Sequence, residues 1–166
     1  MTMIEKTYPI TEKLILNALQ LAQQLYQDLN QEADALKKLQ QAELISTLAA
    51  SKKQLVAQLE QFNAQLTQVL ATEKLPNGQD SVKEYFKRAE TAGLPTAEAV
   101  NNWTQLMSVC SECRSQNEQN GASIDVLSRH THRSLDILKG KPQAANTYGA
   151  NGSTQSERYT RPLISV

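Results

Sequence analysis

Apolar residues recur at alternating spacings of four and three along the first part of the chain. The set is Ile15, Leu19, Ala22, Tyr26, Leu29, Ala33 and Leu36. This heptad pattern is typical of an amphipathic helix whose apolar seam must be covered by a partner helix. The pattern therefore predicts a long helix that packs lengthwise against another helix.

A second seam follows, out of phase with the first. It consists of Leu48, Leu55, Leu59, Phe62, Leu66 and Val69, with Lys52 interrupting one apolar position. A single helix from Thr11 to Thr72 would be ~90 Å long with its seam uncovered, because each residue adds about 1.5 Å. We therefore expect a turn near Leu39 to Gln41 that folds the two segments back on each other.

Glycine and proline mark the next boundaries. The sequence Leu75-Pro76-Asn77-Gly78 predicts a turn, because proline fixes φ and Asn-Gly tolerates positive φ. Ser81 and Glu84 have the spacing of a capping box and predict the start of a short helix that runs to Ala92. Gly93 is then expected to end this helix in a left-handed conformation.

A last long helix is predicted from about Pro95 to Lys139, because proline suits a first helical turn and Gly140 with Pro142 ends the pattern. Its apolar stripe is interrupted by a polar patch. The stripe consists of Val100, Trp103, Met107 and Cys110, and then of Ile124, Leu127, Thr131, Leu135 and Leu138.

The predicted fold class is all-α: an antiparallel, coiled-coil-like bundle of three long helices and one short helix over residues 1–140. Residues 141–166 are rich in Asn, Gly, Ser, Thr and Gln. So few apolar side chains cannot offset the entropy lost on ordering. We therefore expect a flexible tail until it binds a partner.

Charge and composition exclude several function classes. The chain has 17 Lys and Arg against 17 Asp and Glu. It therefore lacks the basic field expected of a nucleic-acid or membrane-surface binder. No segment approaches the ~18 apolar residues of a membrane span, and the N-terminus lacks the apolar core of a signal peptide. We expect a cytoplasmic protein without direct membrane insertion.

Cys110 and Cys113 form a C-x-x-C pair that must be considered as a metal or redox site. The two histidines, His130 and His132, lie at least seventeen residues further on, about 26 Å along a straight helix. Zinc ligands must converge within ~2.0 to 2.3 Å of the ion, so the chain cannot close such a site. We expect small apolar seam residues here, no metal, no cofactor and no catalytic residue.

The histidines leave one enzymatic alternative open. A helical bundle with an exposed histidine is typical of a phosphotransfer module, in which imidazole is the nucleophile. Such a module needs a lysine nearby on the same face, whereas Lys139 lies two turns from His132. A solvated helix face explains these residues better. A generic coiled-coil adaptor is a further alternative.

The polar patch of the last helix contains Asn117, Asn120 and Gly121 at positions where a seam would be apolar. Glycine inside a helix costs ~1 kcal/mol relative to alanine, so its missing side chain should serve a purpose. Two interpretations are open: a close helix crossing inside the fold, or a notch left for a partner.

The stretch N-x-x-N-G-x-x-I, which ends at Ile124, closely resembles the signature of the FlgN family of flagellar export chaperones. The resemblance continues through Leu135-Asp-Ile-Leu138 and through Tyr148-Gly149-Ala150-Asn151-Gly152, which is similar to that family's tyrosine–glycine motif. The closing Arg161-Pro-Leu-Ile-Ser-Val166 is similar to the family's short apolar C-terminus.

This resemblance implies a helical hairpin fold and a cytoplasmic monomer or weak dimer. It implies that the hook-filament junction proteins FlgK and FlgL are the cargo, and that delivery to the type III export gate goes through FlhA. The expected cargo-binding residues are Asn117, Asn120, Gly121, Ile124, Leu127, Thr131, Leu135 and Leu138. Tyr148, Gly149 and Gly152 are the expected docking residues for the export gate.

Overall fold

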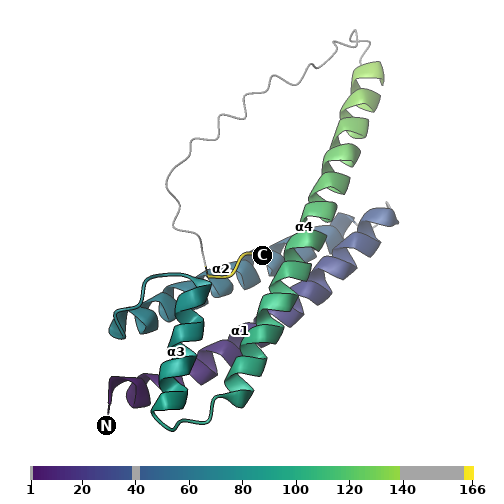
Figure 1. Cartoon of the computed structure of the whole chain (residues 1–166). Coiled ribbons are helices and arrows are strands. Elements are labelled where there is room, and N and C mark those ends of the chain that lie inside the picture. Colours follow the sequence, from purple (N-terminus) through teal and green to yellow (C-terminus); the bar gives the residue numbers. More distant parts are fainter. Residues whose placement is uncertain (1, 39–41, 139–162) are drawn as a thin grey trace.

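The computed structural model describes residues 2–38, 42–138 and 163–166, apart from the side chains of His130, Thr131 and Ser134. Within these residues every regular element is a helix (Figure 1). The helices are α1 (Met3–Lys37), α2 (Ala42–Thr72), α3 (Gln79–Thr91) and α4 (Ala97–Leu138). The predicted all-α class, with three long helices and one short helix, is confirmed.

The two out-of-phase seams form two separate helices, as predicted. α1 ends at Lys37, α2 begins at Ala42, and the two pack against each other along their length. Residues 39–41, where the turn was predicted, lie outside the described residues. Figure 1 shows α2 running back along α1, so that the pair forms an antiparallel hairpin.

α1 is the central helix of the bundle. It packs extensively against both α2 and α4, whereas α2 and α4 make few contacts with each other. α4 runs in the same direction as α1. Near the start of both helices the Tyr8 hydroxyl donates a hydrogen bond to the Pro95 carbonyl, and further along both helices the Asn120 amide donates to the Leu29 carbonyl. α2 returns the chain to the start of α1, and α3, whose Tyr85 is hydrogen-bonded to Thr7 and Thr11 of α1, connects it there to the start of α4 (Figure 1).

α1 begins earlier than its heptad seam. Glu5 accepts hydrogen bonds from the backbone N–H and the hydroxyl of Thr2, which satisfies the helix start at Met3. Pro9 lies inside the helix. Burial of Ile4 and Tyr8 in the core stabilises this first part of the helix despite the proline.

The short helix does not start as predicted. α3 begins at Gln79, with Gly78 at the N-cap position, and Ser81 is a buried residue within the first helical turns. The prediction that Ser81 and Glu84 form a capping box was wrong, because the helix begins two residues before Ser81. Its end was predicted correctly: Gly93 has φ of +81°, and the Leu94 N–H bonds to the carbonyl of Ala89 at 3.0 Å.

The core-facing stripe of α4 differs in phase from the prediction. Trp103 and Cys110 are buried as expected, but Val100 is 39% exposed. Pro95 lies before the helix, which starts at Ala97, and Lys139 lies outside the described residues. The residues that face α1 recur every three or four positions. They are Ala99, Trp103, Leu106, Cys110 and Cys113.

The last four residues belong to the bundle rather than to a separate tail. Leu163 and Ile164 are buried at 1% and 4% exposure and are part of the hydrophobic core. Figure 1 shows this segment, in yellow, between α2 and α4. Within the region predicted as a flexible tail, Leu163 and Ile164 thus have defined positions in the core of the bundle. Residues 139–162 lie outside the described residues.

Candidate partner-binding surfaces

A polar layer crosses the bundle where the polar patch of α4 meets α1 and α2. The Lys52 ammonium lies 3.3 Å from a carboxylate oxygen of Glu32 and donates to the Asn117 side-chain oxygen at 3.2 Å. The Asn120 amide donates to the same Glu32 carboxylate at 3.0 Å and to the Leu29 carbonyl at 2.9 Å. Three helices are thus joined by one network, which we call the polar layer (Glu32, Lys52, Asn117 and Asn120).

The polar layer explains two anomalies of the sequence. Lys52 interrupts the apolar seam of α2 because its ammonium neutralises Glu32, whose side chain is only 2% exposed. Asn120 is equally buried and also accepts from Gln116 at 2.8 Å. A buried carboxylate is costly unless it is paired and hydrogen-bonded, and here it is both. Asn117 and Asn120, both expected to bind cargo, therefore make intramolecular contacts in this structure.

Gly121 lies just beyond the polar layer and is exposed. A Cβ atom added at Gly121 would meet nothing within 4 Å. The close helix crossing is therefore excluded as the reason for this glycine. The other interpretation, a notch for a partner, stays open because the missing side chain faces free space.

A groove lies beside Gly121, between the last turns of α1 and the middle of α4. Its volume is about 780 Å³. The walls combine apolar and polar side chains: Ala33, Leu36, Val126 and Leu127 with Asn30, Asp34, Gln119 and Ser123. This mixture suits the apolar face of an amphipathic helix with polar residues at its margins.

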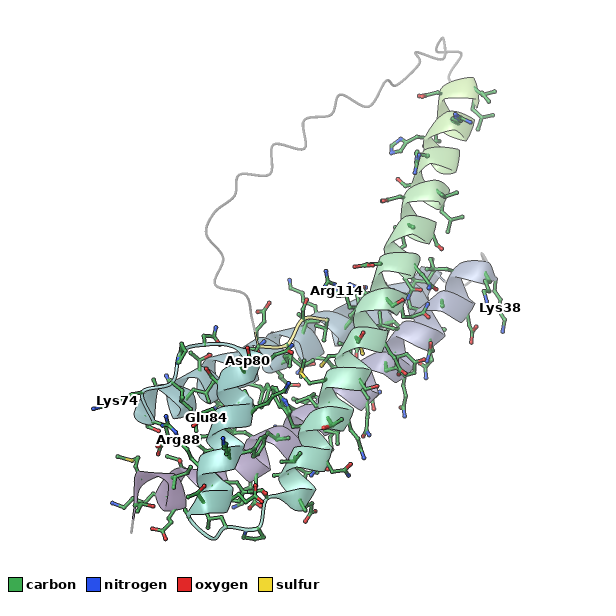
Figure 2. The ribbon with its side chains drawn as sticks, in the orientation of Figure 1. Lys38, Lys74, Asp80, Glu84, Arg88 and Arg114 are labelled. Carbon is green, nitrogen blue, oxygen red and sulfur yellow. The ribbon has the colours of Figure 1, made fainter. Side chains whose placement is uncertain are left out.

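α4 then continues beyond the bundle, and its apolar side chains lose their partner helix. Glu32 pairs with Asn120, and α1 ends only five residues after Glu32. Figures 1 and 2 show the end of α4 projecting past the end of α1. The large apolar residues exposed in this projecting part are Ile124, Val126, Leu135, Ile137 and Leu138.

The predicted cargo residues are thus divided between two environments. Ile124, Leu135 and Leu138 are exposed on the projecting part of α4, and Leu127 is half-buried beside the groove. The side chain of Thr131 lies outside the described residues. Tyr148, Gly149 and Gly152, the predicted export-gate residues, also lie outside them.

The cysteines lie in the α1–α4 seam and are free thiols. Burial raises the pKa of both Cys110 and Cys113 to about 12, and the Cys113 thiol points at the Ala22 carbonyl at 3.5 Å. Such thiols are protonated and unreactive at neutral pH. Within the described residues, no group of three or more metal-ligating side chains comes together.

Segment 163–166 forms a second distinctive arrangement, centred on Asn63 of α2. The Ile164 N–H donates to the Asn63 side-chain oxygen at 3.0 Å, and the Asn63 amide donates to the Ile164 carbonyl at 3.2 Å. Burial of a Leu or Ile side chain stabilises by about 1.5–3 kcal/mol. The segment therefore has both apolar and main-chain anchors.

Comparison with known proteins gives a family match. The sequence model of the FlgN protein family matches residues 7–156. The chain belongs to the FlgN family. This protein is therefore a flagellar export chaperone, from a family of chaperones rather than of enzymes, and FlgN-family chaperones bind flagellar export substrates. No curated protein sequence and no solved structure matches the chain significantly.

The family assignment places the surfaces in context. The match includes the polar layer, the groove and the projecting part of α4. Across the described residues, no helix of this FlgN-family chain has the length and hydropathy needed to cross a membrane. His132 is exposed on α4, and the family's chaperone role favours a solvated helix face over phosphotransfer.

Sequence reasoning missed two groups of residues. Val126 and Ile137 are exposed apolar side chains that were left out because they lie off the heptad stripe. Asn63 was missed because nothing in a Gln- and Leu-rich helix distinguishes one asparagine from other polar surface residues. The only available signal was the Leu163-Ile164 pair, two adjacent apolar residues after a polar tail.

Proposed function

We propose that this FlgN-family chaperone binds FlgK and FlgL in the cytoplasm through the projecting part of α4 and the groove beside it. The observation that carries the proposal is the exposed apolar surface from Ile124 to Leu138, which continues the seam of α4 past the end of α1. The groove supplies a second wall at its base. An amphipathic helix of the cargo would cover this surface as α1 covers the first half of α4.

The test is to place charge on this surface in the full-length protein. Leu135→Asp combined with Leu138→Asp should lower the affinity for purified FlgK and FlgL at least tenfold, because a carboxylate would be desolvated against the cargo. Both side chains are exposed, so the thermal unfolding temperature should stay nearly unchanged. Isothermal titration calorimetry measures the affinity.

The matched control is Arg133→Asp, which lowers the net charge by the same two units at an exposed position on the other side of the helix from Leu135. It should bind cargo like the wild type. Equal loss in both variants would mean that net charge, rather than the apolar surface, governs binding. Unchanged affinity in the double variant would place the cargo site elsewhere.

Delivery to the export gate belongs to the same proposal. Tyr148, with Gly149 and Gly152, carries the similarity to the family's tyrosine–glycine motif, and an aromatic ring with a hydroxyl suits a pocket with a polar partner. Tyr148→Ala should weaken FlhA binding of the chaperone–cargo complex while FlgK and FlgL affinity stays nearly intact. Equal loss toward both partners would assign Tyr148 to the cargo site.

A further inference from the structure

Segment 163–166 occupies a site that the bundle leaves open. α2 and α4 both pack on α1 but make few contacts with each other, and segment 163–166 lies between them (Figure 1). We call the space that this segment occupies the channel. Leu163 and Ile164 enter the core through this channel. In Figure 1 the segment lies between α2 and α4, away from the projecting end of α4.

The site recognises main chain as well as side chains. Asn63 bonds to both the N–H and the C=O of Ile164, at 3.0 and 3.2 Å. This pairing satisfies both polar groups of one residue, as a neighbouring strand would, and it does not depend on which side chain the residue carries. Selectivity for one peptide over another therefore comes from the apolar contacts that its side chains make around Asn63.

The apolar contacts of the segment continue past Ile164. Val166 lines a further groove of about 380 Å³, together with Leu25, Leu29 and Val56. Lys52 and Asn117 of the polar layer lie at the same groove. The channel therefore has more room than segment 163–166 fills, and it offers apolar contacts for two adjacent residues and for a third two positions later.

We propose that the channel around Asn63 is a docking site for a short, non-helical peptide with two adjacent apolar residues followed by a third, and that segment 163–166 fills it in cis. The segment is joined to α4 through residues 139–162, so its effective concentration at the site is high. Among the described residues, it is held by two hydrogen bonds between the Asn63 side chain and the Ile164 backbone, by two buried side chains and by the partly buried Val166. A second peptide of this chemistry exchanges with it. This site is separate from the α4 surface proposed for cargo.

The first test uses the full chain and measures hydrogen exchange of the Ile164 amide by NMR. In the wild type this amide should exchange at least tenfold more slowly than in Asn63→Ala, which removes both bonds to the segment. Gln65→Ala, an exposed change on the same helix, should leave the rate unchanged. Equal exchange in wild type and Asn63→Ala would overturn the docking. Loss of protection on dilution, with a dimeric mass, would assign the segment to a second copy and overturn docking in cis.

The second test asks whether the site takes a peptide in trans. The probe is a fluorescein-labelled peptide of residues 159–166, titrated against the full-length wild type and against a full-length variant with Leu163→Ser and Ile164→Ser. The variant should bind the peptide at least tenfold more tightly, because its own segment no longer competes. Exchange protection should appear in α2 around Asn63.

Two controls complete the second test. We call the variant with Leu163→Ser and Ile164→Ser the opened variant. The labelled peptide with the same two serines should not bind to it, and adding Asn63→Ala to the opened variant should weaken binding of the unchanged peptide several-fold. Equal affinity of wild type and opened variant, or protection confined to residues 121–138, would overturn the proposal. Binding by neither protein would also overturn it, provided that circular dichroism shows the opened variant folded. If that variant is unfolded, the Ile164 exchange test decides.

Discussion

The two halves of α4 share one helix but have different surroundings. From Ala97 to Asn120 the helix is covered by α1, and its buried stripe ends in the polar layer. From Gly121 to Leu138 it keeps a high apolar content, yet large side chains such as Ile137 and Leu138 are 64% and 83% exposed. The comparison teaches that an apolar seam shows only that a partner is needed. The length of the neighbouring helix decides whether the partner is internal or external.

Thiol reactivity should show the largest difference between the halves. Burial raises the pKa of Cys110 from 9.0 to about 12, so at pH 8 its thiolate fraction falls roughly a thousandfold, in addition to the steric protection. A cysteine introduced by Ser128→Cys, on the exposed half, should react with iodoacetamide that much faster than Cys110 and Cys113. Mass spectrometry of the time course measures the rates.

The same shift has a consequence for stability with a definite sign. The unfolded chain loses the thiol protons near pH 9, whereas the folded chain keeps them until about 12. The contribution of the two thiols to the free energy of unfolding is therefore fully present below pH 9 and is lost as the pH rises toward 12. In the iodoacetamide experiment, rapid modification of Cys110 at pH 8 would mean that the half of α4 from Ala97 to Asn120 opens readily.

Core truncation should separate the halves next most strongly. Leu106→Ala removes a side chain that is fully buried against the bundle, and it should lower the free energy of unfolding by about 2–5 kcal/mol. Ile137→Ala, in the projecting half, should change it by less than about 0.5 kcal/mol. Urea unfolding followed by circular dichroism measures both. Similar losses would show that the projecting half is also covered in solution.

The polar layer marks the boundary between the halves, and breaking it should have an intermediate effect. Asn120→Ala leaves the Glu32 carboxylate without one of its donors and should cost about 1–3 kcal/mol. Gln119→Ala, at an exposed neighbouring position, is the control and should be nearly neutral. The same urea titrations apply. A neutral Asn120→Ala would mean that water replaces the amide at little cost.

The smallest effect, with the opposite sign, is expected at Gly121. Gly121→Ala should stabilise the protein by up to about 1 kcal/mol, because alanine is the better helix former and its Cβ meets no neighbour. If the notch serves a partner, FlgK or FlgL affinity should fall although stability rises. A rise in stability with unchanged affinity would leave this glycine without a role in cargo binding.

Much of the fold could be predicted from the sequence, because heptad seams and Gly-Pro boundaries are local signals. The separation of α1 from α2 and the left-handed cap at Gly93 follow from such signals alone. The phase of the α4 stripe could not be predicted, because Val100 and Ala99 are both apolar and only the position of α1 decides which is buried.

The surfaces were harder to predict than the helices. Asn120 has the same sequence features whether it faces a partner or the buried Glu32, since the distinction depends on residues 88 positions apart. The docking of Ile164 on Asn63 joins residues 101 positions apart. Contacts at such separations leave no periodic trace in the sequence, whereas a continued apolar stripe does, which is why Leu135 and Leu138 could be nominated.

The projection of α4 beyond α1 gives the molecule a lever. Leu138 lies eighteen residues past Asn120, which corresponds to roughly 27 Å of helix beyond the polar layer. A tilt of about 5° at the polar layer would move the tip by ~2 Å. A small tilt of this kind would reposition the apolar end of the arm with little change in the bundle. Because this end projects past α1 (Figure 1), a polypeptide can contact it without disturbing the core.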